Sequence, residues 1–110
     1  MKRLIIGILV LTSCISHAQN FEEHIKKGGQ LYSGNDFEKS AKEYEKAFLL
    51  NEGNSSQYYN AACSWALTGD TLKSIEFLNL SAEKGWKNLK HLKKDSDLST
   101  LHGVYGWDEI

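Results

Sequence analysis

The chain has 110 residues, enough for one domain, and its 41% hydrophobic and 25% charged residues are typical of a soluble globular protein with a formal net charge of −1. The absence of proline, with nine glycines mostly between apolar-periodic stretches, favours helices joined by short turns over a β-sandwich or barrel. No segment alternates apolar and polar residues for long enough to predict a strand.

The N-terminal segment has the parts of a secretory signal peptide. A basic start at residues 2–3 is followed by an apolar run over residues 4–11. Ser16 and Ala18 are small residues at the two positions that a signal peptidase recognises before its cleavage site. We therefore expect residues 1–18 to be removed and the protein to be exported, either periplasmic or secreted.

Two alternatives apply to this segment. The apolar run is shorter than the ~20 residues that span a bilayer, so we expect no membrane span once the signal is removed. Residues 11–14 resemble a bacterial lipobox, which would make Cys14 a lipidated N-terminus. A lipoprotein is therefore the second interpretation.

Removal of the signal leaves 11 basic and 14 acidic residues, a net charge of −3. This mildly acidic body gives no reason to expect a nucleic-acid partner. Cys63 is then the only cysteine, so the exported domain has no internal disulfide.

Residues 21–33 place apolar and small residues at helical spacing and predict the first helix. Gly28 within it costs ~1 kcal/mol relative to alanine but allows a partner helix to pack backbone to backbone. Asp36 follows a turn and is positioned as the N-cap of a second helix over residues 37–51. The charged side of this helix is interpreted as a solvated face.

Residues 56–68 predict a third helix that is apolar nearly all round, as expected in the middle of a stack. Gly69 and Asp70 supply the next turn and N-cap, and residues 71–84 predict a fourth helix. The residues expected to bury this fourth helix are Leu72, Ile75, Leu78 and Ala82.

The segment after the fourth helix is less regular. Its leucines, at positions 89, 92, 98 and 101, are expected to cap the open end of the stack. Its lysines, at positions 84, 87, 90 and 94, are interpreted as a solvated face, the alternative being a site for an anionic partner. Trp107 and Ile110 resemble the first buried positions of a helix that does not continue.

Asp95 and Asp97 begin a sequence like that of a calcium-binding loop. Thr100 stands where the loop requires its turn glycine, and Gly106 stands where it requires a bidentate glutamate. We therefore expect no metal here and interpret Asp97 as the N-cap of a short last helix.

A pattern of small residues and one aspartate recurs with a spacing of 34 residues, the period of a helix–turn–helix repeat. Gly28, Asp36, Ser40 and Ala47 in the first copy correspond to Ala62, Asp70, Ser74 and Ser81 in the second.

On these residues, the chain from 21 to 85 resembles two tandem tetratricopeptide repeats. Residues 60–101 also resemble the segment that closes such repeat groups in bacterial exported proteins. Lys27, at a place that is normally apolar, and the missing proline depart from the pattern. The packing positions that the resemblance implies are Gly28, Ser40, Tyr44, Ala47, Ala62, Trp65, Ser74, Leu78 and Ser81.

The resemblance implies an all-α fold in which antiparallel helix pairs stack as a short solenoid. Residues 19–102 would form the domain, followed by an unfinished tail at residues 103–110. Within the domain the expected parts are repeats at about 21–54 and 55–88 and a cap at 86–102.

In tetratricopeptide stacks the first helix of each pair lines the concave face. The partner-binding residues implied here are Ile25, Gly29, Tyr32, Tyr59, Cys63 and Ala66. Family members that clamp a C-terminal carboxylate use Lys and Asn on this face, and only Asn60 remains, so an apolar or aromatic-bearing segment is expected. The alternative is that the two tyrosines pack against the closing segment.

No nucleophile elbow, phosphate-binding glycine loop or paired-histidine metal motif is present in the sequence. Cys63 has candidate bases at His24, His91 and His102, but no spacing aligns any of them with it. We therefore expect that the protein is non-catalytic and has no cofactor. We expect it to bind a segment of another protein or a peptide. The alternative is the N-terminal structural part of a longer exported protein whose activity lies beyond Ile110.

Overall fold

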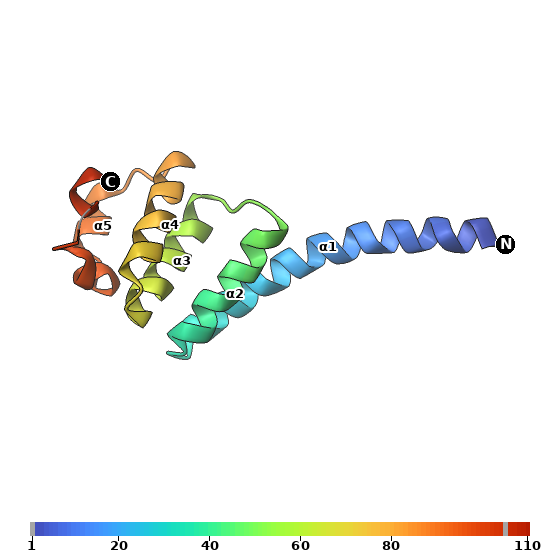
Figure 1. Ribbon diagram of the computed structural model, residues 1–110, viewed down its shortest axis with the longest axis horizontal. Helices are drawn as coiled ribbons and strands as arrows, with labels where there is room; N and C mark the ends of the chain where they lie inside the picture. Colours follow the sequence, from blue (N-terminus) through green and yellow to red (C-terminus); the bar gives the residue numbers. More distant parts are fainter. Residues whose placement is uncertain (1, 105) are drawn as a thin grey trace.

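The computed structural model describes the backbone of residues 2–104 and 106–110, and the side chains of residues 18–104 and 106–110. Throughout these residues the only regular elements are helices, which confirms the all-α prediction (Figure 1). They are the α-helices α1 (Lys2–Ser33), α2 (Phe37–Leu50), α3 (Ser55–Thr68), α4 (Thr71–Glu83) and α5 (Leu89–Lys94), and the 3₁₀ helices η1 (Ser96–Leu101) and η2 (Trp107–Glu109).

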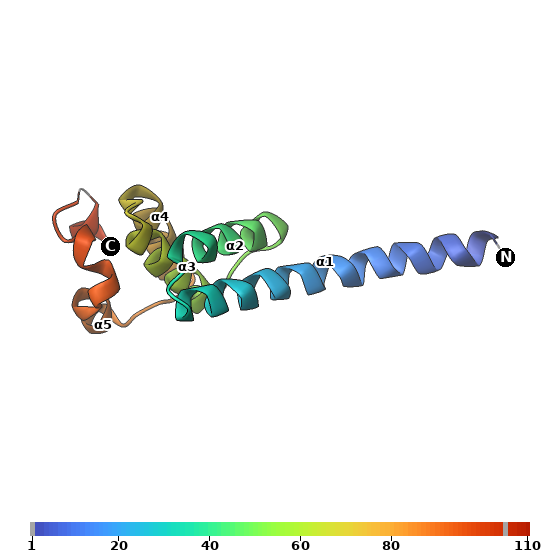
Figure 2. The same cartoon turned by 90° about the horizontal axis from the view of Figure 1, so that it is seen from below.

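The helices pack as two antiparallel pairs, α1 with α2 and α3 with α4, and α2 packs against α3 to stack one pair on the other. The closing segment, α5 to η2, covers the far end of the second pair, whereas the N-terminal part of α1 projects alone from the body (Figures 1 and 2). Within the described part of the chain, no helix is both long enough and apolar enough to cross a membrane.

Local capping explains why the helices begin where they do. The Asp36 side chain accepts a 3.4 Å hydrogen bond from the Lys39 amide, and Asp70 accepts one of 3.1 Å from the Lys73 amide. Asn54 and Gln57 form a reciprocal capping box at the start of α3, with distances of 2.8 and 2.9 Å. The bounds of α2, α3 and α4 therefore lie within one residue of the predicted ones.

The start of α1 differs from the prediction. The helix begins at Lys2 rather than near residue 21, because no proline or turn sequence separates residues 2–20 from the amphipathic part that follows. Removal of residues 1–18 stays a prediction.

An aromatic cluster joins the two helix pairs. Phe48 of α2 lies 4.7 Å from Tyr58 of α3 and 5.4 Å from Phe77 of α4, measured between ring centroids. Tyr44 stacks on Phe48 from the other side. The nine expected packing positions are all buried: Gly28, Ser40, Tyr44, Ala47, Ala62, Trp65, Ser74, Leu78 and Ser81.

The prediction that Leu72 and Ala82 of α4 are buried is wrong. Leu72 is 76% exposed and Ala82 is also exposed, whereas Ile75 and Leu78 are buried. Ala82 is exposed in a pocket that it lines together with Leu89 and Leu92 of α5. The close approach at Gly28 also differs, because the ring of Tyr44, not a backbone, packs against it.

The closing segment inserts leucines under the second pair. Leu92, Leu98 and Leu101 are at most 4% exposed, whereas Leu89 is 52% exposed and does not cap the stack. The end of the chain forms the 3₁₀ helix η2, and its Trp107 and Ile110 pack partly buried against the core.

Candidate functional site

A cavity of about 380 Å³ lies between the two helix pairs and the closing segment. Three of the expected partner-binding residues line it: Tyr32 at the end of α1, and Tyr59 and Cys63 on α3. The remaining lining residues are Asn60, His91, Asp95, Ser96 and Asp97.

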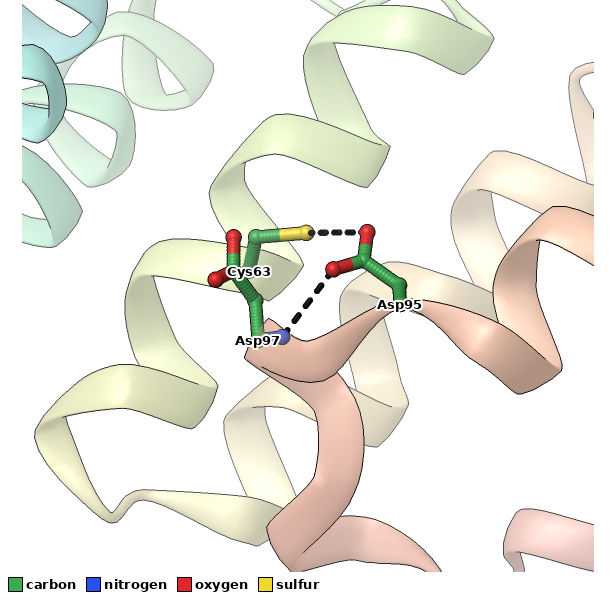
Figure 3. Close-up of side chains that lie close together, drawn as sticks. All are labelled: Cys63, Asp95 and Asp97. Atoms are coloured by element: carbon green, nitrogen blue, oxygen red, sulfur yellow. Dashed lines mark hydrogen bonds between the residues drawn. The ribbon is translucent and has the colours of Figure 1, made fainter.

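Hydrogen bonds connect these side chains across long sequence separations. The Tyr59 hydroxyl donates to Asp95 Oδ2 at 2.7 Å, and the Tyr32 hydroxyl donates to Asp97 Oδ2. The Cys63 thiol donates a 3.8 Å hydrogen bond to Asp95 Oδ2, and this bond is one of the dashed lines in Figure 3. The polar tips of both tyrosines therefore contact the closing segment, as in the alternative set out above.

Asp95 lies at the junction between α5 and η1. Because α5 ends at Lys94 and η1 begins at Ser96, the single residue between them becomes the N-cap. Its Oδ1 accepts a 3.0 Å hydrogen bond from the Asp97 amide. The N-cap is thus Asp95, and the expectation that Asp97 caps the last helix is wrong.

Two aromatic side chains, Trp86 and His91, pack near the ring of Tyr59. Trp86 stacks on it with a centroid distance of 4.1 Å and an interplanar angle of 13°, and the His91 ring lies 5.8 Å away. His91 Nε2 lies 3.5 Å from Asp95 Oδ2, so this imidazole reaches the same carboxylate as Tyr59 and Cys63.

Burial and the two nearby carboxylates raise the pKa of the Cys63 thiol and of the Tyr32 and Tyr59 hydroxyls, so these groups stay protonated. Burial, and then Asp95 and Asp97, raise the pKa of the Cys63 thiol above its ordinary value. The hydrogen bond to Asp97 raises the pKa of Tyr32, and burial followed by the bond to Asp95 raises that of Tyr59. A protonated thiol is a poor nucleophile, so Cys63 has none of the activation that a catalytic cysteine requires.

The other three expected partner-binding residues lie outside the cavity. Ala66 is only 2% exposed, and Ile25 and Gly29 are half-buried on α1. A partner contact through these residues stays a prediction.

Sequence reasoning did not assign the four closing-segment residues of the cavity, His91, Asp95, Ser96 and Asp97, to a site. The sequence indicated the two aspartates as the start of a calcium-like loop, Asp97 also as an N-cap, and His91 as a candidate base for Cys63. The missing information is spatial, because Tyr32 and Asp97 are 65 positions apart and no local pattern brings them together.

Comparison of the chain with protein-family models, with curated proteins and with solved structures finds no match. The helix pairs themselves are the evidence for the fold. Their stacking is compatible with a helical repeat.

Proposed function

We propose that this chain is an exported, non-catalytic module of the tetratricopeptide type that binds an extended or helical segment of another protein. The 34-residue repeat supports this proposal, because equivalent residues occupy equivalent places in both helix pairs. Ser40 and Ser74, one repeat apart, each donate a hydrogen bond to the carbonyl 12 residues earlier, on Gly28 and Ala62.

The observation that carries the proposal is the cavity between the first helices of the two pairs. Its volume of about 380 Å³ is large enough to accept one or two side chains of a partner. Asn60 is exposed, Tyr32 is half-buried and the His91 side chain is 53% exposed, so these three form an accessible rim. We call Asn60, Tyr32 and His91 the rim of the cavity.

The negative charges of Asp95 and Asp97 limit which chemical class of partner the cavity can accept. Asp95 and Asp97 place two carboxylates in the lining of the cavity, and these would repel the C-terminal carboxylate of a peptide that entered it. The partner segment is therefore one that presents an apolar or aromatic side chain to Tyr32, a residue type favoured at interfaces.

The test is capture of the partner by cross-linking with the full chain expressed in its export compartment. Asn60→Ala should reduce capture at least several-fold without changing the melting temperature, because this side chain is exposed. Asn79→Ala, on the exposed side of α4, is the matched control and should change neither.

A second variant separates binding from packing. Tyr32→Ala combined with Tyr59→Ala should weaken capture beyond what the loss of folded protein explains. Lower stability with unchanged affinity would assign both tyrosines to packing against the closing segment. Capture of no specific partner would favour the alternative, a structural part of a longer exported protein, and would contradict the proposal.

A further inference from the structure

Metal-binding side chains of two chemical kinds, a thiol and two carboxylates, meet on the floor of the cavity, and a histidine lies beside them. The donor atoms of Cys63, Asp95 and Asp97 all lie within 4.8 Å of one another, with Cys63 on α3 and the aspartates on the closing segment (Figure 3). His91 adds an imidazole, and thiolate, imidazole and carboxylate are the ligands that Zn²⁺ takes in proteins.

Two donor pairs already have the separation that a shared ion requires. Tetrahedral zinc with bonds of about 2.0–2.3 Å places neighbouring donors about 3.3–3.8 Å apart. The Cys63 Sγ to Asp95 Oδ2 distance is 3.8 Å, and the His91 Nε2 to Asp95 Oδ2 distance is 3.5 Å. The His91 side chain is 53% exposed, so its ring has room to adjust.

The carboxylates accept hydrogen bonds but have little cationic compensation in the described part of the chain. The Asp95 side chain is only 15% exposed and its one cationic partner is His91, which is charged only when protonated. Asp97 makes no ion pair in the described part of the chain, and the lysines of α5, at positions 90, 93 and 94, are exposed and pair with neither aspartate. Buried charges are ordinarily paired or coordinate metals.

The two tyrosines act as orienting groups around this set. Tyr59 donates to Asp95 and Tyr32 donates to Asp97, so each carboxylate is fixed by a phenol. Hydrogen bonds of this kind hold metal-binding carboxylates in place, and their loss typically costs 10–100-fold in metal affinity.

We propose that the floor of the cavity is a Zn²⁺ site that ties the closing segment to α3. Its donors are Cys63, His91, Asp95 and Asp97. On binding, the thiol proton is released to solvent and the sulfur becomes a thiolate ligand. The site goes beyond the proposed function, because it adds an ion below the rim, and His91 belongs both to the rim and to the donor set.

The experiment uses the untagged full chain stripped of metal. Titration with ZnCl₂ by calorimetry should give one site per chain, and Co²⁺ should produce the near-ultraviolet absorption band of a thiolate–cobalt bond. Cys63→Ser should remove that band, and Asp97→Asn should weaken Zn²⁺ binding at least tenfold. Tyr32→Phe, which keeps the ring, should weaken it 10–100-fold.

Asp108→Asn, at an exposed position outside the cavity, is the matched control and should bind Zn²⁺ like the parent chain. Each variant is melted without metal, so that a folding defect is separated from loss of a ligand. No Zn²⁺ binding by the parent chain, or binding undiminished in both Cys63→Ser and Asp97→Asn, would overturn the proposal. Partner capture that persists after chelation would leave the proposed function intact.

Discussion

The Ser40 hydroxyl donates a 2.6 Å hydrogen bond to the carbonyl oxygen of Gly28, from the second helix of a pair to the first. One repeat later Ser74 donates a 2.7 Å bond to the carbonyl of Ala62, so the same tie recurs in both pairs. Both serines are fully buried, and their positions are 34 residues apart. The sequence repeat is thus also a repeat of specific contacts.

Removing these hydroxyls should destabilise both pairs. Ser74→Ala should cost about 0.5–1.5 kcal/mol of unfolding free energy, the net worth of one buried hydrogen bond. Ser40→Ala should cost more, because Ser40 also lies 2.9 Å from the Ser64 hydroxyl, which would lose its partner. Urea unfolding measures both, with exposed Ser99→Ala as control. Equal stability of all three variants would show that the ties contribute nothing.

Gly28→Leu should separate the first helix pair. A Cβ at Gly28 would lie 2.9 Å from two ring atoms of Tyr44, closer than real contacts allow. Overpacking of this kind costs about 1–3 kcal/mol. Gly103 has nothing within 4 Å, so Gly103→Leu is the matched control and should melt within a few degrees of the parent chain. An unchanged melting temperature for Gly28→Leu would show that α1 repacks freely.

Tyr44→Ala should be among the most damaging single changes. The ring is only 3% exposed and fills the space between Gly28 and Phe48, so truncation leaves a cavity worth about 3–5 kcal/mol. Tyr44→Phe keeps the ring and should lose far less. Denaturant unfolding measures the difference, and a comparable loss in the two variants would place the energy in the hydroxyl instead.

The hydrogen bond between His24 of α1 and Glu43 of α2 should make stability depend on pH. Burial alone would raise the pKa of Glu43, but the His24 hydrogen bond at 2.5 Å and the Lys46 charge outweigh it and lower the pKa below its ordinary 4.5. Because the folded pKa is depressed, this stabilisation is present above pH 4.5 and is lost as the pH falls through the lowered value.

Glu43→Gln should therefore cost about 1 kcal/mol at pH 7 and close to nothing near pH 3. Unfolding in urea at the two pH values gives the comparison, and Glu38→Gln, which removes an exposed pair with Lys42, is the control. A cost that is the same at both pH values would assign the effect to packing of the side chain.

Processing of the N-terminus is tested by mass. We expect a mature chain that begins at Gln19 and carries no lipid, because Ala18 and Ser16 satisfy a signal peptidase. Intact-mass measurement on protein from the export compartment identifies the terminus, and Cys14→Ser should be processed like the parent chain. A diacylated species that begins at Cys14 would establish the lipoprotein alternative.

The sequence by itself determined the helices α2, α3 and α4 to within one residue, together with their order and pairing. The reason is that their determinants are local: Asp36 and Asp70 cap the helix that follows each of them, and apolar spacing defines each buried face. Periodicity also indicated a wide apolar face on α4. It did not indicate which part another layer covers, so Leu72 was expected inside and lies outside.

The cavity was decided only by the tertiary structure. Asp95 meets Tyr59 across 36 residues and Asp97 meets Tyr32 across 65, and neither approach follows from spacing within one segment. They are brought together because Leu98 and Leu101 of η1 are buried completely, which fixes the closing segment against α3. Burial of these apolar side chains fixes the position of the closing segment. The polar groups beside the leucines are brought together because the segment lies there.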